Sequence, residues 1–296
     1  MPIPKFDRPT VYDGAKGTLM AAALAQAGKQ ASDVTEWLNI LAPEAVLKAH
    51  REYIDAGSQV IQTNTFNGNR FRLADYGLAD RVHEVNLSGA RLAREAAGSE
   101  VAVAGKLGPS GKMLVTGEVT VEELRQAFAE QAAALAEGEV DFFHVETMTD
   151  LDEAVAAVEG VRTVSQLPVA LTMSFDTGNP DTGLRTMMGV SPAAMVEKAT
   201  GLGLLAVGVN CGRGLEGYQV LVEQLLAASP KGFLIAKLNA GKPRMVEGRI
   251  EYDASPEEAV DYALWCARKG VRLIGMCCGS TPRHVEAIAN AFAKGV

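Results

Sequence analysis

The strongest constraint on the fold is an alternation that recurs eight times along the 296-residue chain. A short run of apolar or β-branched residues ends at or near a Gly, Asn, Asp or Thr, and an alanine-rich stretch with helical spacing follows. Because the runs are apolar on both faces, they are typical of parallel strands buried between helices. The runs span residues 10–14, 59–66, 101–108, 140–147, 168–175, 204–211, 233–240 and 271–278.

Helix starts between these runs are also marked. Thr120 and Glu123 predict a capping box. Three further starts place a capping residue before a proline, at Ser191, Ser255 and Thr281. Eight strands alternating with eight helices predict an α/β protein with a single (β/α)8 TIM barrel, rather than an open sheet. No linker-like stretch divides residues 1–296, so we expect one domain, with 176–183 as a local turn.

Composition excludes several classes of partner. Apolar residues make up 48% and charged residues 22% of the chain, as in ordinary globular proteins with a sizeable core. The formal charge of -8 argues against nucleic acid, whose binding requires Lys and Arg to neutralise phosphates. No apolar run is long enough to suggest a membrane span. The start "MPIPKFDRPT" lacks the pattern of a secretory signal, so we expect a cytoplasmic protein with reduced thiols.

The barrel prediction places chemistry at the carboxyl ends of the strands and in the loops that follow. Three of the four cysteines fall at two such ends, while Cys266 lies within a helical stretch. Other polar residues share these positions. The strand-end residues with useful chemistry are Asp13, Thr65, Glu146, Cys211, Asn239, Cys277 and Cys278.

The adjacent pair Cys277–Cys278 has three interpretations: apolar packing, a strained vicinal disulfide, or two ligands for one soft ion. Cys211 at a second strand end favours the ligand interpretation. Zinc prefers thiolates in a tetrahedral arrangement, and catalytic zinc sites keep one position open. An open, thiolate-rich zinc site suits activation of a second thiol, because a metal-bound thiol loses its proton near neutral pH.

The strand-end acids suggest what that second thiol carries. Asp13 and Glu146 beside a metal would bind an amino group, which an amino-acid thiol such as homocysteine supplies. The glycines near Asp13, beginning with Gly14, leave backbone N–H groups open to a carboxylate. The alternative is that this Asp-Gly pair forms only a turn.

Seven segments, spread in order over nearly the whole chain, resemble the zinc-dependent homocysteine S-methyltransferases. That family includes betaine–homocysteine methyltransferases, S-methylmethionine enzymes and the homocysteine module of cobalamin-dependent methionine synthase. The Asn-Cys and Cys-Cys-Gly elements are the most specific. The segments are "DGAKGTLM" (13–20), "QTNTF" (62–66), "GKLGPSG" (105–111), "VETM" (145–148), "GVNCG" (208–212), "NAGKP" (239–243) and "GMCCGSTPRH" (275–284).

The resemblance implies a (β/α)8 barrel with Zn²⁺ on Cys211, Cys277 and Cys278. It also implies that the homocysteine sulfur joins the zinc and attacks the donor methyl group directly, giving methionine without a covalent enzyme intermediate. The amino-acid end of homocysteine would contact Asp13, Gly14 and Glu146, and Thr65 of the "QTNTF" element is a further candidate contact. Asn239 would be an oxygen ligand, or a near neighbour, when homocysteine is absent.

The methyl donor is less constrained. Met276 replaces a glycine of the family's usual "GGCCG". Segments 173–195 and 235–243 are most similar to short bacterial enzymes assigned to betaine, whereas "QTNTFNGNR" resembles the methionine synthase module. Aromatic candidates to surround an onium donor are Tyr12, Trp37, Phe66 and Phe175.

Three functions therefore remain open. The leading expectation is methyl transfer from betaine or a similar small onium compound to homocysteine. A second takes the methyl group from S-methylmethionine or from a separate methylcorrinoid protein partner. A third, of another class, is a non-catalytic thiol- or metal-binding barrel that uses the Cys277–Cys278 pair as a redox sensor. A homo-oligomer is compatible with each of them.

Overall fold

The computed structural model describes residues 6–30, 32–179, 183–212, 214–242, 244–246 and 249–295. Eight strands form one sheet in the order β1-β12-β9-β8-β5-β4-β3-β2. The strands are β1 (Thr10–Val11), β2 (Val60–Gln62), β3 (Ala102–Leu107), β4 (Phe142–Met148), β5 (Val169–Met173), β8 (Ala206–Asn210), β9 (Phe233–Leu238) and β12 (Leu273–Met276).

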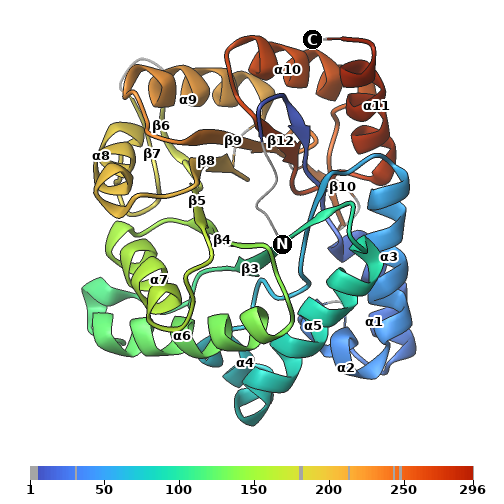
Figure 1. Cartoon of the computed structure of the whole chain (residues 1–296), viewed down its shortest axis with the longest axis vertical. Helices are drawn as coiled ribbons and strands as arrows, with labels where there is room; N and C mark the ends of the chain where they lie inside the picture. Colours follow the sequence, from blue (N-terminus) through green and yellow to red (C-terminus); the bar gives the residue numbers. More distant parts are fainter. Residues whose placement is uncertain are drawn as a thin grey trace. The chain divides into compact units, whose positions relative to one another are not determined.

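Parallel pairing joins these strands into a (β/α)8 TIM barrel (Figure 1). Tyr12, just after β1, forms a parallel bridge with Val60 of β2, so the first and last strands of the order are also joined. Each barrel strand lies in one of the eight apolar runs, although β4 extends one residue beyond its run. The predicted fold class is therefore confirmed.

Helices connect the strands. The α-helices are α1 (Gly17–Gln26), α2 (Leu38–Leu41), α3 (Pro43–Asp55), α4 (Arg70–Ala74), α5 (Val82–Ala97), α6 (Val121–Glu137), α7 (Leu151–Val164), α8 (Pro192–Leu202), α9 (Leu215–Ala227), α10 (Pro256–Arg268) and α11 (Pro282–Ala293). Short 3-10 helices occur at Thr35–Trp37, Ala79–Arg81 and Leu114–Thr116.

The chain divides into two compact units. The first is built from Lys16–Arg51 and Ile61–Ala170, and the second from the described residues of 6–15, 52–60 and 171–295. The expectation of one domain over 1–296 stays a prediction.

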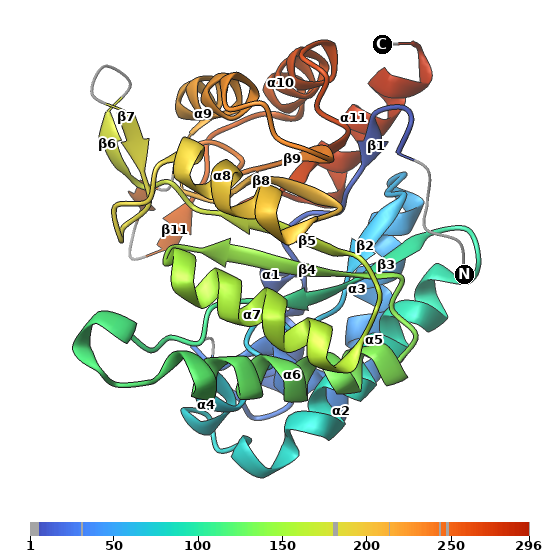
Figure 2. The same ribbon diagram turned by 60° about the vertical axis from the view of Figure 1, so that its left-hand side comes forward.

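In the first unit, α6 and α7 lie side by side in both ribbon views (Figures 1 and 2). The apolar face of α6 is buried, including Leu124, Phe128 and Leu135. Gly160 of α7 allows the close approach, because a Cβ atom there would lie 2.4 Å from the carbonyl oxygen of Arg125. In the second unit, α10 and α11 pack together in the same way.

Two short hairpins were not predicted. The segment 176–183, expected to be a turn, contributes β6 (Thr177–Asn179), which pairs antiparallel with β7 (Gly183–Arg185). The second hairpin pairs β10 (Arg244–Val246) with β11 (Arg249–Glu251). Each strand has only three residues, too few to show a hydrophobic period.

The predicted helix starts are confirmed. Thr120 and Glu123 form the capping box of α6, and Ser191, Ser255 and Thr281 precede α8, α10 and α11.

We expect Thr120→Ala to lower the free energy of unfolding by about 1 kcal/mol, because it removes the acceptor for the Glu123 amide at the start of α6. Urea unfolding followed by circular dichroism measures the effect. Thr116→Ala is the control, since Thr116 is exposed, ends a short 3-10 helix and lies outside any cap of an α-helix. An equal decrease in the free energy of unfolding of the two variants would contradict the capping assignment.

Candidate active site

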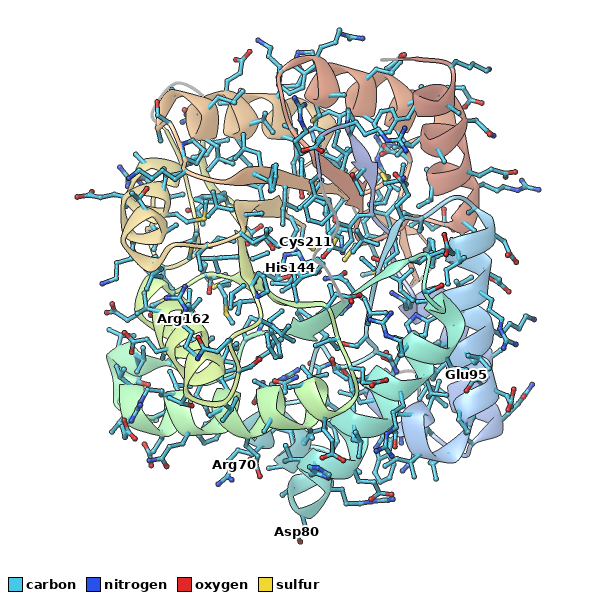
Figure 3. All side chains as sticks on the ribbon, viewed as in Figure 1. Arg70, Asp80, Glu95, His144, Arg162 and Cys211 are labelled. Carbon is cyan, nitrogen blue, oxygen red and sulfur yellow. The ribbon has the colours of Figure 1, made fainter. Side chains whose placement is uncertain are left out.

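The sulfur atoms of Cys211, Cys277 and Cys278 all lie within 4.8 Å of one another, and we call this group the thiol cluster. The Sγ atoms of Cys211 and Cys278 are 3.4 Å apart, and all three cysteines are free thiols that are partly exposed. Figure 3 shows Cys211 in the interior, among the strands of its unit. The three strand-end cysteines thus converge as the sequence predicted, whereas Cys266 is buried in α10.

Cys211 is held in an unusual backbone conformation at the end of β8. Its φ of 58° lies in the left-handed region, which a non-glycine residue adopts only at a cost of about 1–3 kcal/mol. Two hydrogen bonds hold the residue there. The Cys211 amide donates to the carbonyl oxygen of Lys237 at 3.3 Å, and the Cys211 carbonyl oxygen accepts from the Tyr218 hydroxyl. Local strain of this kind is concentrated at functional sites.

Cys277 and Cys278 follow β12 in a turn, and both backbone polar groups of Cys277 are hydrogen-bonded. The Cys277 amide donates to the carbonyl oxygen of Leu238, and its carbonyl oxygen accepts from the Ser280 hydroxyl at 2.8 Å. Met276, which replaces the family's usual glycine, is the last residue of β12 and is fully buried in register with Leu238. Its side chain is therefore part of the core of this unit.

Two further side chains contact the sulfur atoms. Asn210, fully buried on β8, donates from Nδ2 to Cys277 Sγ at 3.9 Å, and its Oδ1 accepts from the Thr172 hydroxyl at 2.6 Å. Tyr252 is hydrogen-bonded to Cys278. Its ring lies directly over Gly279, where a Cβ atom would be 2.1 Å from Cγ of the ring. Such contacts orient metal-binding thiolates and adjust their charge.

Two thiols of the cluster, those of Cys211 and Cys277, have pKa values above the usual value of a cysteine. The hydrogen bond with Cys277 lowers the pKa of Cys211, but the contact with Cys278 and burial outweigh it and raise that pKa to about 12. Hydrogen bonds with Cys211 and Cys278, followed by burial, raise the pKa of Cys277 well above its usual value. Three thiolates packed this closely repel one another, so a cation must replace the protons for all three to ionise.

The residues of the cluster fit a thiophilic metal ion. Two sulfur ligands of a tetrahedral zinc ion lie about 3.8 Å apart, close to the 3.4 Å between Cys211 and Cys278. Asn239, just after β9 in the same unit, is buried, and its Oδ1 has no hydrogen-bond partner among the residues that the structure describes. A buried oxygen in that state is suited to complete a coordination sphere.

The other predicted site residues of this unit surround the end of β1. Asp13 is fully buried, and its Oδ1 lies 3.6 Å from Nζ of Lys237. Gly14 is needed for close packing, because a Cβ atom there would lie 2.4 Å from the Ser280 hydroxyl and 2.9 Å from that of Tyr53. Sequence reasoning missed Lys237, which sits inside the apolar run of β9.

Two further predicted site residues, Thr65 and Glu146, belong to the first unit. The Thr65 hydroxyl donates to the carbonyl oxygen of Lys106 at 2.8 Å and pairs with Thr63 at 2.6 Å. Glu146 is buried, accepts from Gln62 and lies 3.5 Å from Nδ1 of His144. Their predicted contacts with substrate stay predictions.

His144 is a core histidine with a polar partner. It is fully buried on β4, and its Nδ1 is 3.0 Å from Nε2 of Gln62 (Figure 3). Glu36, which sequence reasoning missed, is another buried carboxyl group of this unit. Burial raises its pKa, and it accepts from the Asn67 amide at 2.6 Å.

The aromatic candidates for an onium donor site stay predictions, and three of them are placed as follows. Tyr12 and Phe175 are buried in the core, with exposed fractions of 0% and 1%. Trp37 is covered by Lys29, whose Nζ is 3.3 Å from the ring centroid. Tyr252, which is partly exposed, contacts a sulfur atom of the thiol cluster and was not among the predicted aromatic candidates.

A family model described as homocysteine S-methyltransferase matches residues 10–292. The chain belongs to the homocysteine S-methyltransferase family. The match covers the strand-end residues of both units, and it confirms the predicted family and enzyme class. Among the described residues, no helix has the length and apolar character needed to cross a membrane.

Curated relatives of this family member include two methionine synthases. The enzyme of Mycobacterium tuberculosis strain H37Rv is 32% identical over 97% of this chain, and that of Mycobacterium leprae is 30% identical over the same share. The chain spans only 25% and 24% of these proteins, about a quarter of their length.

Solved structures with the same fold include the homocysteine methyltransferase MmuM from Escherichia coli. Its metallated form superposes with a TM-score of 0.78 at 22% identity, and its oxidised form with 0.77 at 23%. The comparison covers 96% of both chains for the metallated form and 95% for the oxidised form. At this identity the likeness supports the fold alone.

Proposed function

We propose that this family member transfers a methyl group from a small onium donor, betaine or a similar compound, to the thiol of homocysteine, with Zn²⁺ held by the thiol cluster. The observation that carries the proposal is the convergence of the three thiols. Asn239 of the same unit supports it, because its buried Oδ1 has no hydrogen-bond partner among the described residues. Bound zinc would lower the pKa of the substrate thiol and keep it ionised near neutral pH.

The reaction is a direct displacement. The ionised sulfur of homocysteine attacks the methyl carbon, an S–CH₃ bond forms, and the electron pair of the breaking bond leaves with the donor nitrogen. Methionine and a demethylated amine result, and the thiol proton goes to solvent. No oxidant or covalent enzyme intermediate is required.

The chain's own residues would bind and orient the reactants. Cys211, Cys277 and Cys278 are the proposed metal ligands, and Asn239 the proposed oxygen ligand before homocysteine binds. Asn210 and Tyr252 hold the cysteine sulfurs in place. In our proposal, the amino-acid end of homocysteine is bound by Asp13, Gly14, Thr65 and Glu146.

A second donor follows from a different observation. The curated relatives at 30–32% identity are methionine synthases about four times the length of this chain. If the family member works as the matching portion of such a protein does, its methyl group would come from a separate methylcorrinoid protein. S-methylmethionine is a further candidate, because the family that the sequence resembles includes S-methylmethionine enzymes.

A cytoplasmic location is part of the proposal, because the four cysteines are free and a reducing compartment keeps them so. The third function considered from the sequence, a non-catalytic thiol-binding barrel, becomes an outcome of the test below.

The test is a donor panel. Zinc-loaded protein is incubated with homocysteine and, separately, betaine, dimethylsulfonioacetate, S-methylmethionine or methylcobalamin, and methionine is quantified. We expect turnover with betaine or dimethylsulfonioacetate, lost on chelation and restored by zinc. Turnover with methylcobalamin alone would favour the corrinoid protein. No turnover, together with a reversible disulfide in the cluster, would instead indicate a redox sensor.

A further inference from the structure

Lys237 is a buried charge that the proposed reaction does not use. It is the last residue but one of β9, a strand otherwise made of Phe, Leu, Ile and Ala, and only 2% of it is exposed. Its Nζ lies 3.6 Å from Oδ1 of the equally buried Asp13 and 4.8 Å from the ring centroid of Tyr12. Lysine is almost never buried in this way unless it is paired.

The backbone of Lys237 also links the acid to the thiol cluster. Its carbonyl oxygen accepts from the Cys211 amide at 3.3 Å and from the Tyr218 hydroxyl at 3.1 Å. Lys237 is in register with Asn210 on one side and with Gly275 on the other. One residue therefore fixes both the Asp13 carboxylate and the strand end that carries Cys211.

The charge of this pair limits what can bind to it. An isolated buried carboxylate would attract any cation, including an amine that carries no carboxylate. Paired with an ammonium group, Asp13 contributes no net charge. A neutral pair matches a zwitterion, whose own charges cancel, better than a simple cation, because an added cation would leave one positive charge uncompensated in a poorly solvated place.

We propose that Lys237 is a positioning residue that holds Asp13 for the amino group of the substrate and makes the site select a zwitterionic amino-acid thiol over a simple aminothiol. This inference rests on the proposed function, in which Asp13 receives the amino group of homocysteine. It assigns substrate selectivity to a lysine outside the thiol cluster.

The test compares two thiols that differ only in the carboxylate. Dissociation constants for homocysteine and for 3-aminopropane-1-thiol are measured by calorimetry on the zinc-loaded protein without a methyl donor. The preference for homocysteine is the dissociation constant of the aminothiol divided by that of homocysteine. For Lys237→Met we expect this ratio to fall by about tenfold or more. For Lys237→Arg, which keeps the charge, we expect the preference to stay within about threefold of the unmodified protein.

Lys269→Met is the matched control. Lys269 directly follows α10 at the surface and pairs with Glu223 at 3.1 Å. This variant therefore changes the net charge by the same amount as Lys237→Met and leaves the surroundings of Asp13 unchanged. Its preference should equal that of the unmodified protein. If Lys237→Met weakened both thiols by the same factor, Lys237 would have a structural role only, and the inference would be overturned.

If Lys237→Met does not fold, the neutral double variant Asp13→Asn/Lys237→Met replaces it. We expect both thiols to bind more weakly to it, with a preference within about threefold of the unmodified protein, because the pair still has no net charge. A tenfold shift toward the aminothiol would overturn the inference. An unmodified, zinc-loaded protein that binds no homocysteine would overturn the proposed function, and the inference with it.

Discussion

Cys278→Ser is expected to release the metal and to abolish methyl transfer. Serine keeps the size of the side chain but replaces the soft thiolate with a hydroxyl group that is a poor zinc ligand. We expect bound zinc to fall from one per chain to less than about a tenth, and kcat/KM for homocysteine to fall by about a hundredfold or more. Metal content is measured by emission spectroscopy after gel filtration.

The chain provides a matched control in Cys266→Ala. Cys266 is buried in α10 beside Tyr262, outside the thiol cluster. This variant should keep its zinc and its activity, with a loss of about 1 kcal/mol in stability. Equal zinc content in the two variants would exclude the thiol cluster as the metal site.

Gly208→Ala is expected to be the most destabilising of the substitutions considered. Gly208 lies on β8 in register with Ile235 of β9, and a Cβ atom there would be 1.9 Å from the Ile235 carbonyl oxygen. Backbone must move to relieve that overlap. We expect a loss of about 3 kcal/mol or more, and a fall of about 5 °C or more in Tm.

Gly201→Ala is the control for this prediction. Gly201 lies in α8, and a Cβ atom there would meet nothing within 4 Å. Because alanine is the better helix former by about 1 kcal/mol, this variant should unfold at a slightly higher temperature. Calorimetry of both variants gives the comparison. Equal Tm values would contradict a close approach of β8 and β9 at Gly208.

Much of the fold follows from patterns that the sequence shows directly. Buried parallel strands must be apolar on both faces, so the eight runs predict the eight barrel strands. The hairpins β6–β7 and β10–β11 were missed for a physical reason. Their three-residue strands depend on pairing with a neighbour rather than on burial, as the exposure of β6 illustrates. Periodicity carries no signal for such strands.

The site was predicted as far as barrel geometry allows. Cys211, Cys277 and Cys278 could be brought together because the carboxyl ends of parallel strands share one end of a barrel. Lys237 was missed because a strand of Phe, Leu, Ile and Ala was treated as core throughout. The signal was present, however: a lysine in a strand buried on both faces requires a buried acid as partner.

Side-chain partners beyond the strand ends could not be predicted. Tyr252 reaches Cys278 from a segment that follows β11, 26 positions before it in the chain. The hydrogen bond from Asn210 to Cys277 likewise depends on the register of β8 with its neighbours. Both contacts are set by tertiary packing, which the local sequence does not encode.

The central claim is that the thiol cluster holds zinc and presents it to the homocysteine sulfur. The most direct test is X-ray absorption at the zinc edge, with and without homocysteine. We predict three sulfur neighbours at about 2.3 Å plus one oxygen in the free protein, changing to four sulfurs when homocysteine is added. A first shell that stays at three sulfurs, or that contains fewer than three at the start, would contradict the account.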